Sequence, residues 1–270
     1  AHSTYRNLPP VTREVHGRSE EKKKLDSWLS SGTPMLVISG IAGCGKTTLT
    51  SHWLNEITLT TPDYGVMYYP CQPWDTPLGI ATSLLHKIGV GVDEGKHDPY
   101  NILEALPLRP GVEIDIDSYR RRLSAHLLDE SGLTTKAESQ LLVVLDDVHN
   151  IGSEGNHLFG ALLQVAEVTP LSLILISRNR LSFYDTRDVH TRERVEEIHL
   201  SGLSIEEVDA WISSMNLPSE TEAAKIHSIT GGHPLAVELL ELYGKTVHED
   251  WTRFLDQEIL DVLPQDSREI

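Results

Sequence analysis

The sequence predicts an α/β fold in which a parallel five-stranded sheet is flanked by helices and followed by a small all-α region. Three observations predict it. Short apolar runs alternate with segments of helical periodicity, which is typical of βαβ units. A glycine-rich loop joins the first of these runs to a helix. After residue 201 the signal for strands stops, and only helical patterns follow.

The expected strands are short apolar runs bounded by polar or turn residues. They are PMLVIS at 34–39, GVMYY at 65–69, LLVVLD at 141–146, LSLILIS at 171–177 and the weaker EEIHL at 196–200. Leu49, Trp53 and Ile57 recur at four-residue spacing and predict a helix after the first strand. Residues 91–117 read as an irregular segment, in which VEIDID at 112–117 could form a short strand or a solvated acidic loop.

The region after residue 201 carries helix start signals. Ser204 and Glu207 have the spacing of a capping box, and Pro234 suits the first turn of a second helix. We therefore expect an α/β domain over 1–200 and a helical domain over 201–260. Residues 261–270 look like the start of a truncated further domain.

Composition and charge restrict the function classes. The chain has 270 residues and a formal net charge of −17, from 40 acidic and 23 basic residues. That balance argues against broad electrostatic binding to nucleic acid, which needs a basic face. The two cysteines, Cys44 and Cys71, make neither a metal pattern nor a disulfide framework. No apolar run is long enough to cross a bilayer and no export signal is visible, so we expect a cytoplasmic protein that does not contact membranes.

Residues 40–47, GIAGCGKT, fit the phosphate-binding pattern G-x-x-x-x-G-K-[ST] in full. Glycines let the backbone N–H groups turn inward toward phosphate oxygens. Lys46 would bind the β- and γ-phosphates of a nucleoside triphosphate, and the Thr47 hydroxyl would bind Mg²⁺. Cys44 reads as a small filler within the loop. The pattern predicts a P-loop that holds a nucleoside triphosphate.

Acidic and basic residues follow two other expected strands. Asp146 is assigned to the Mg²⁺ shell, and Asp147 is assigned to orienting or deprotonating the attacking water. A solvated strand end with acidic caps is the alternative interpretation of this pair. Arg178 follows the strand at 171–177 and could sense the γ-phosphate. The alternative is a basic loop that balances Asp185 and Asp188, and Arg180 is the less favoured sensor.

Several segments around the P-loop resemble STAND ATPases, the signal-transduction class that includes plant resistance (NB-ARC) proteins. VHGRSEE at 15–21 resembles the h-h-G-R-x-x-E element that precedes their P-loop. SGLSIEEV at 201–208 and TGGHPLAVELL at 230–240 resemble their G-L-S-x-E-E stretch and the G-x-P motif of their lid. The segments at 68–76 and 177–189 are similar to archaeal members. The resemblance covers the chain from about residue 9 to 262.

The resemblance implies roles for residues on the adenine side, within an N-terminal segment at about 9–21 and in the lid. Val15, His16 and Arg18 would line the adenine and ribose, and Pro234 would pack against the adenine. Thr48 would contact the α-phosphate, beside the loop residues Gly43, Cys44 and Gly45. The alternative interpretations are that Gly17-Arg18 only starts a helix and that Pro234 is only a first-turn proline. Relatives continue into a winged helix, sensor domains and effector domains, which this sequence lacks.

The leading hypothesis is a signal-transduction switch that binds Mg-ATP and hydrolyses it slowly. ADP would hold a closed form, and ATP would favour an open form that self-associates. One alternative is an AAA+ initiator-type ATPase that loads onto DNA, against which the acidic balance argues. Others are a small-molecule P-loop kinase and an ATP-binding scaffold without turnover. Only the resemblance favours adenine over guanine.

Overall fold

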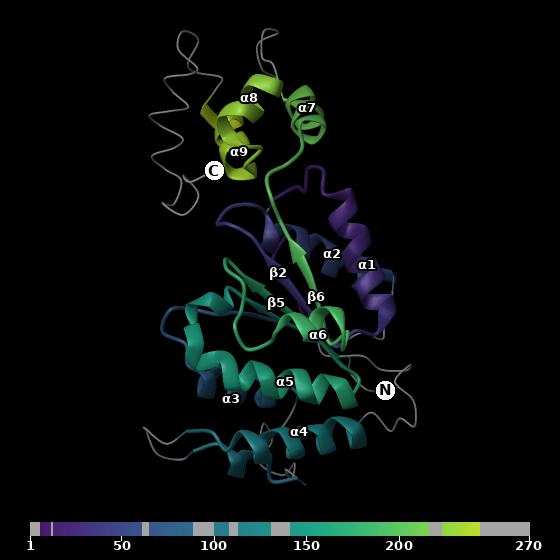
Figure 1. Ribbon diagram of the computed structural model, residues 1–270, viewed down its shortest axis with the longest axis vertical. Helices are drawn as coiled ribbons and strands as arrows, with labels where there is room; N and C mark the ends of the chain where they lie inside the picture. The colour runs from purple at the N-terminus through teal and green to yellow at the C-terminus, as the bar shows by residue number, and fades with distance from the viewer. Residues whose placement is uncertain are drawn as a thin grey trace.

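Six parallel strands form one sheet in the order β1-β3-β4-β5-β2-β6 (Figure 1). The computed structural model describes residues 6–11, 13–60, 65–88, 100–107, 113–130, 141–215 and 223–243. The strands are β1 (Arg6–Asn7), β2 (Met35–Ser39), β3 (Gly65–Pro70), β4 (Leu141–Asp146), β5 (Leu171–Ser177) and β6 (Val195–His199). The predicted parallel sheet of five strands is confirmed, and the two-residue β1 extends it at one edge.

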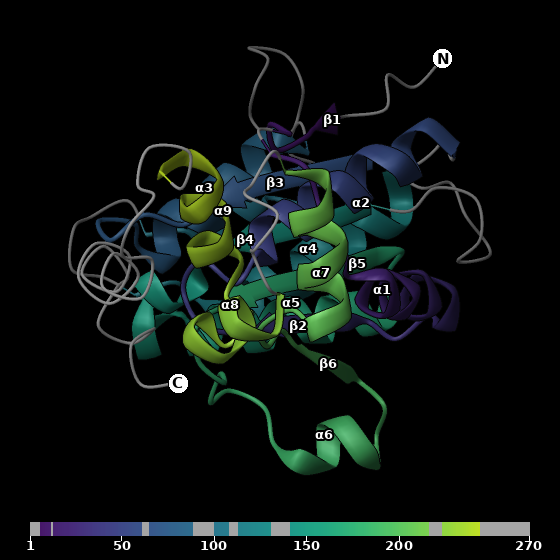
Figure 2. The ribbon, with the colours of Figure 1, turned by 90° about the horizontal axis from the view of Figure 1, so that it is seen from above.

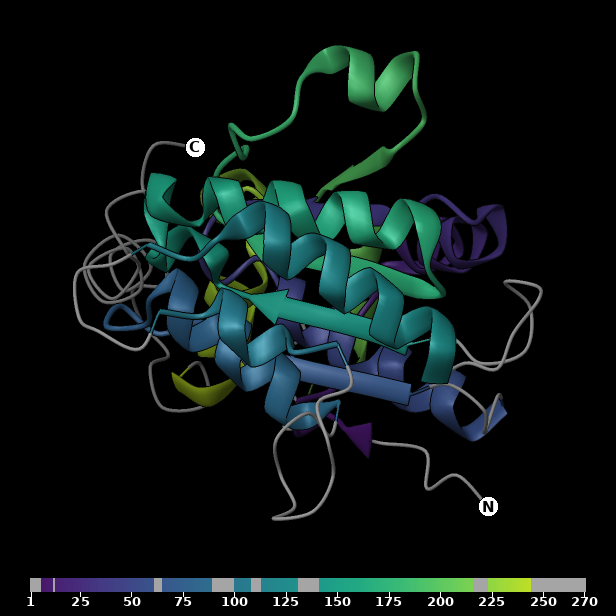
Figure 3. The same cartoon turned by 90° about the horizontal axis from the view of Figure 1, so that it is seen from below.

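Helices cover both faces of the sheet. The α-helices are α1 (Ser19–Ser31), α2 (Lys46–Thr60), α3 (Pro77–Lys87), α4 (Ile116–Glu130), α5 (Asn156–Val168), α6 (Thr186–His190), α7 (Ile205–Ser214), α8 (Ala223–Thr230) and α9 (Pro234–Tyr243). Short 3-10 turns lie at η1 (Ile102–Ala105), η2 (Val148–Asn150) and η3 (Gly152–Gly155). Helices α1 and α2 pack on one face, and α3 and α5 pack on the other with α4 outside them (Figures 1 and 3).

Alternation along the strands separates two apolar cores. On β2, Leu36 and Ile38 join Trp28 and Trp53 in the core beneath α1 and α2. Val37 points the other way, into the core beneath α3 and α5. Since both faces of a parallel sheet are covered, its strands are apolar throughout. This explains why the runs at 141–146 and 171–177 stood out in the sequence.

All six strands end at the same edge of the sheet, because all are parallel. In the register of the ladder, Ser39 of β2 lies beside Ser177 of β5 and His199 of β6. Asp146 closes β4 beside Pro70 of β3. The loops after β2, β4 and β5 therefore converge, and polar residues on them can act on one ligand.

Helices α7–α9, which we call the lid, stand beyond this edge of the sheet (Figures 1 and 2). Its core contains Leu203, Val208, Trp211 and Val237. The predicted capping box is present, with Ser204 and Glu207 each accepting the other's backbone N–H. Helix α6, between β5 and β6, projects away from the rest of the structure (Figure 2).

Within the acidic segment predicted at 112–117, the described residues 113–117 form no strand, and the last two of them are helical. Asp115 precedes α4, and its carboxylate accepts the Ser118 N–H at 3.0 Å. Ile116 and Asp117 are the first residues of α4. Asp115 thus satisfies a backbone donor at the start of this helix, which an alternation pattern could not predict. The expected further domain at 261–270 lies outside the described residues. Among the described residues, none of the helices is long and apolar enough to span a membrane.

Candidate nucleotide site

The phosphate loop follows β2 and ends at the first residue of α2. The Lys46 ammonium lies within it and donates to the carbonyls of Gly40 at 2.6 Å and Ile41 at 2.8 Å. A Cβ at Gly40, where φ is +151°, would lie 2.4 Å from the carbonyl oxygen of Leu200. Only glycine fits this approach of the loop to the chain leaving β6. The phosphate loop therefore packs directly against the segment that leads from β6 to the lid.

The Cys44 side chain is buried in the core beneath α1 and α2. Its Sγ lies 3.8 Å from Lys46 Nζ. This placement agrees with the interpretation of Cys44 as a small apolar filler of the loop.

Asp146 is buried at the end of β4, directly opposite the loop. Its Oδ2 accepts the Thr47 hydroxyl at 2.7 Å and the Tyr68 hydroxyl at 2.8 Å. Its Oδ1 accepts the Asp147 N–H at 2.8 Å. Burial raises the pKa of Asp146, while the hydrogen bonds from Thr47 and Tyr68 oppose that rise. The site therefore pairs two residues from distant parts of the sequence that were both assigned to the metal.

The oxygen ligands of this pair fit Mg²⁺. The Thr47 hydroxyl and the Asp146 carboxylate are hard oxygen donors held within hydrogen-bonding distance. Mg²⁺ keeps several water ligands and takes one or two protein oxygens together with the phosphates of a nucleotide. It needs no larger cluster, and the described residues contain no group of three or more acidic, histidine or cysteine ligands. Thr47 and Asp146 are the residues that would hold it.

Tyr68 was not predicted as part of this site. It lies on β3, next to β4, and shares with Asp146 the sheet face that α2 covers. Burial and the adjacent Asp146 raise the pKa of Tyr68, which keeps the hydroxyl protonated as a donor. The sequence gives no strand order, so the proximity of these two side chains could not be read from it.

Replacing Tyr68 with phenylalanine tests this contact. Loss of a hydrogen bond to a buried carboxylate should lower the free energy of unfolding by about 1–3 kcal/mol, measured by urea denaturation. Because the Tyr68 hydroxyl lowers the pKa of Asp146, the acid limb of the pH profile for hydrolysis of Mg-ATP, the reaction that the sequence predicts, should move to higher pH. Tyr69→Phe, on the opposite face of β3, is the control and should leave the acid limb in place. An unmoved limb in Tyr68→Phe would refute a role for this hydroxyl.

Asp147 follows in the left-handed region, with φ at +54°. Because of this conformation, Asp147 does not continue the strand, and its side chain is 49% exposed. The His149 ring is partly buried, and its Nδ1 lies 3.8 Å from an Asp147 carboxylate oxygen. Asp147 therefore presents an accessible carboxylate one residue after Asp146, and its role in orienting water stays a prediction.

Arg178 is exposed and follows β5, which lies between β2 and β4. This order places it after the strand between the two loops that carry Lys46 and Asp147. Arg180, the less favoured sensor, is paired with Glu197 at 3.2 Å, and Tyr184 also donates to Glu197. The pairing of Arg180 with Glu197 of β6 argues against Arg180 as the sensor. The contact of Arg178 with a γ-phosphate stays a prediction.

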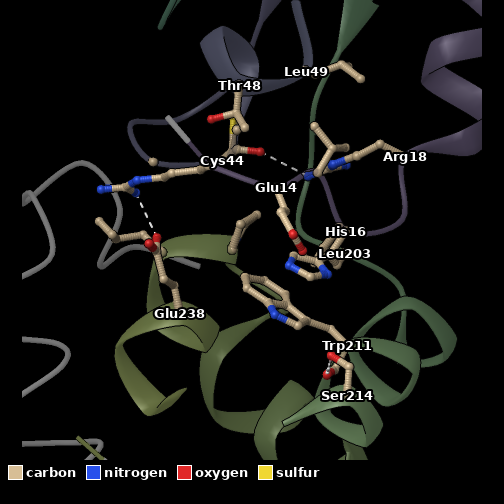
Figure 4. Close-up of a pocket in the computed structure, with 16 residues that line it drawn as sticks. Glu14, His16, Arg18, Cys44, Thr48, Leu49, Leu203, Trp211, Ser214 and Glu238 are labelled. Atoms are coloured by element: carbon tan, nitrogen blue, oxygen red, sulfur yellow. Dashed lines mark hydrogen bonds and ion pairs between the residues drawn. The ribbon is translucent and has the colours of Figure 1, made fainter. Parts of the chain in front are cut away.

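A cavity of about 570 Å³ opens between the phosphate loop, the segment before α1 and the lid (Figure 4). All the predicted nucleotide-binding residues except Lys46 and Thr47 line it. They are Val15, His16, Arg18, Gly43, Cys44, Gly45, Thr48 and Pro234. The structure therefore brings together residues predicted from motifs more than 200 positions apart in the chain.

Arg18 lines this cavity and connects three parts of the structure. It is buried, and its guanidinium donates to the carbonyls of Cys44 and Ser201 and pairs with Glu21 at 2.9 Å. Its backbone N–H donates to the Glu207 carboxylate at 2.6 Å. Arg18 thus ties the start of α1 to the loop and to the lid. Contact with a ribose stays a prediction.

Lid residues that sequence reasoning missed close the other side of the cavity. The Trp211 indole of α7 stacks on the His16 ring, with centroids 4.2 Å apart and planes 9° apart (Figure 4). Glu238 of α9 pairs with Arg13 at 2.7 Å. Flat aromatic faces suit a nucleobase, which stacks well on such surfaces. Trp211 lies within the predicted helix, but helical periodicity alone marks it as a core residue.

The comparisons with known proteins agree with this geometry. The sequence model of the AAA ATPase domain matches residues 14–176, which is more than half of the chain. No curated protein matches the chain.

Solved structures share the fold at low sequence identity. A Walker-type ATPase of Pyrococcus abyssi has a TM-score of 0.55 and 17% identity over 89% of this chain and 71% of that chain. The ORC1 protein of Aeropyrum pernix, in complex with DNA, has a TM-score of 0.52 and 16% identity, covering 91% of this chain and 59% of that one. The ORC2 protein of Aeropyrum pernix, in ADPNP–ADP complexes, has a TM-score of 0.52 and 17% identity. The match covers 93% of this chain and 70% of that one.

The matched region begins one residue before Val15 and ends at the last apolar residue of β5. It contains the phosphate loop, the Asp146–Asp147 pair and the sheet that positions them. The chain therefore belongs to the AAA ATPase domain family of P-loop proteins.

Proposed function

We propose that the chain is the nucleotide-operated part of an ATP-driven switch, which binds Mg-ATP and hydrolyses it. The observation that carries the proposal is the composition of the cavity. Phosphate-loop residues such as Gly43 form one wall, and lid residues such as Trp211 and Pro234 form the other. One ligand filling this space would contact both parts. A change in its phosphates would then change the preferred position of the lid.

The chemistry assigned to the site is attack of water on the γ-phosphorus, with ADP as the leaving group. Lys46 would exchange its loop carbonyls for phosphate oxygens and stabilise their charge. Mg²⁺, held by Thr47 and Asp146, supplies charge neutralisation at the β- and γ-phosphates when bound. Asp147 would orient the water and accept its proton, and Arg178 would sense the γ-phosphate. These roles follow from position and residue type.

Between an initiator-type and a signal-transduction ATPase, the comparisons favour the initiator type. The similar structures include ORC1 and ORC2 proteins, one of them in complex with DNA. Their identities of 16% and 17% support a shared fold only, and the chain covers 59% and 70% of their lengths. The signal-transduction class rests on the motifs at 15–21, 201–208 and 230–240. We therefore propose an initiator-type ATPase whose lid moves with the state of the nucleotide.

The net negative charge of the chain opposes binding to DNA. A formal charge of −17 repels a duplex in general. DNA contact would need either a local basic patch or residues beyond those described.

Phosphate release and duplex binding, measured on the same protein, test the proposal. We expect Mg-dependent release of phosphate from ATP, with no acceptor other than water. An initiator-type ATPase should bind a duplex of about two helical turns with an affinity that falls steeply as salt rises. Binding that ATP controls would support this class, whereas ATP-dependent self-association without DNA binding would favour the signal-transduction class. Absence of both hydrolysis and nucleotide binding would overturn the proposed function.

A further inference from the structure

A histidine of the lid contacts the phosphate loop directly. His233 lies in the turn before α9, is 1% exposed, and donates from Nε2 to the carbonyl of Ala42 at 2.8 Å. Ala42 lies in the middle of the loop, between Ile41 and Gly43. The bond joins residues that are 191 positions apart in the chain. It therefore links the part that holds phosphates to the part that is expected to move.

Three successive carbonyls of the loop are held by side chains. Lys46 binds those of Gly40 and Ile41, and His233 binds that of Ala42. The next residue, Gly43, passes so close to the imidazole that a Cβ there would lie 2.8 Å from His233 Cε1. These three carbonyls are thus held by one residue of the loop itself and by one residue of the lid.

The lid presents this histidine from a rigid turn. Gly232, with φ at +72°, accepts the Leu203 N–H through its carbonyl at 2.8 Å, and a Cβ on it would lie 2.1 Å from the Leu203 carbonyl oxygen. Thr230 accepts the His233 N–H at 3.0 Å. Because the turn leaves the imidazole little freedom, a displacement of the lid must stretch or break the bond to Ala42.

The surroundings of His233 favour the neutral form of its imidazole. Burial lowers the pKa of His233, and the nearby Lys46 and Arg18 charges lower it further, against the hydrogen bond to Ala42. With the proton on Nε2, Nδ1 is an acceptor, and it has no hydrogen-bond partner among the described residues. A phosphate bound near Lys46 and Arg18 would offset their positive charge, and would therefore make it easier for His233 to take up a second proton. The ring is therefore sensitive to what the loop holds.

We infer that His233 is a positioning residue, which fixes the phosphate loop to the lid so that loop shape and lid position change together. The inference rests on the proposed nucleotide switch, and it names the contact that couples its two parts. His233 does not touch the reacting atoms. Its effect on hydrolysis would act through the Ala42 carbonyl and the neighbouring N–H groups that cradle phosphate.

Three variants and a matched control separate coupling from general stability. His233→Leu removes the donor, His233→Asn keeps a polar group that ends short of Ala42, and His233→Gln restores a donor at about the position of Nε2. The control is His227→Leu. His227 also bonds through Nε2 to a carbonyl, that of Leu203 at 3.0 Å, but it does so within the lid.

The first readout needs no nucleotide. Cys44 lies buried in the loop, and Cys71 is buried in the core on the other face of the sheet. The rate at which a maleimide labels each thiol, resolved by peptide mass spectrometry, reports local opening at that place. We expect His233→Leu and His233→Asn to speed labelling of Cys44 by about tenfold relative to Cys71. His233→Gln and His227→Leu should label like the wild type.

The second readout is the affinity for Mg-ATP, titrated into nucleotide-free protein. The leucine and asparagine variants should bind about tenfold more weakly, with His233→Gln restoring most of the affinity. Wild-type labelling rates and wild-type affinity in both His233→Leu and His233→Asn would overturn the inference. If the wild type binds no nucleotide, the proposed function fails, while Cys44 labelling still decides whether His233 holds the loop.

Discussion

Replacing Lys46 with alanine is expected to abolish ATP binding at concentrations up to about 1 mM, the upper end of typical Michaelis constants. The Lys46 ammonium is the cation that the loop surrounds, bound to the carbonyls of Gly40 and Ile41. Without it, those two carbonyls lose their donor, and the phosphates lose their counter-charge. Hydrolysis should fall to background. Calorimetric titration of Mg-ATP and phosphate-release assays would measure the two effects.

A lysine elsewhere provides the control for this substitution. Lys22 lies on α1 and pairs with Glu56 on the surface. Exposed pairs of this kind contribute about 0–1 kcal/mol to stability. Lys22→Ala should therefore bind and hydrolyse ATP like the wild type. Undiminished ATP binding in folded Lys46→Ala would contradict the assignment of the loop as the phosphate site.

Asp147→Asn should lower the turnover of ATP by at least about a hundredfold while leaving its affinity nearly unchanged. An amide cannot accept the proton of the attacking water, but it can still form hydrogen bonds. Asparagine also tolerates the left-handed backbone that residue 147 adopts, with φ at +54°, so the fold should be retained. Single-turnover phosphate release, measured beside equilibrium binding, separates the two quantities.

An acidic residue nearby tests whether charge alone explains such a loss. Glu154 is exposed on the following 3-10 turn. Glu154→Gln removes one negative charge without touching the loop after β4, and it should turn over ATP at the wild-type rate. Equal activity of Asp147→Asn and the wild type would instead place the base elsewhere, or would show that water needs no carboxylate here.

The parts of the site that are contiguous in sequence could be predicted from it. The phosphate loop and the Asp146–Asp147 pair each follow an apolar strand, and the structure places both at one edge of the sheet. The contact between Thr47 and Asp146 then follows from the parallel arrangement of the strands. Val15, His16 and Pro234 were named only through the family resemblance; they line the cavity, and their contact with an adenine stays a prediction.

The parts that depend on tertiary pairing could not be predicted. Tyr68 reaches Asp146 only because β3 and β4 are neighbours in that register. Trp211 and His233 look like ordinary residues of a helical domain, and their importance appears only when the lid is placed over the loop. The acidic segment before α4 was ambiguous because Asp115 acts through its capping hydrogen bond.

The central claim is that one nucleotide contacts both the phosphate loop and the lid. Amide hydrogen exchange, compared with and without Mg-ATP, tests it most directly. The account predicts that ATP slows exchange together in the loop at 40–48, in α7 around Trp211, and at the start of α9. It also predicts that Lys46→Ala loses all of this protection. Protection confined to the loop, with the lid exchanging at its nucleotide-free rate, would contradict the claim.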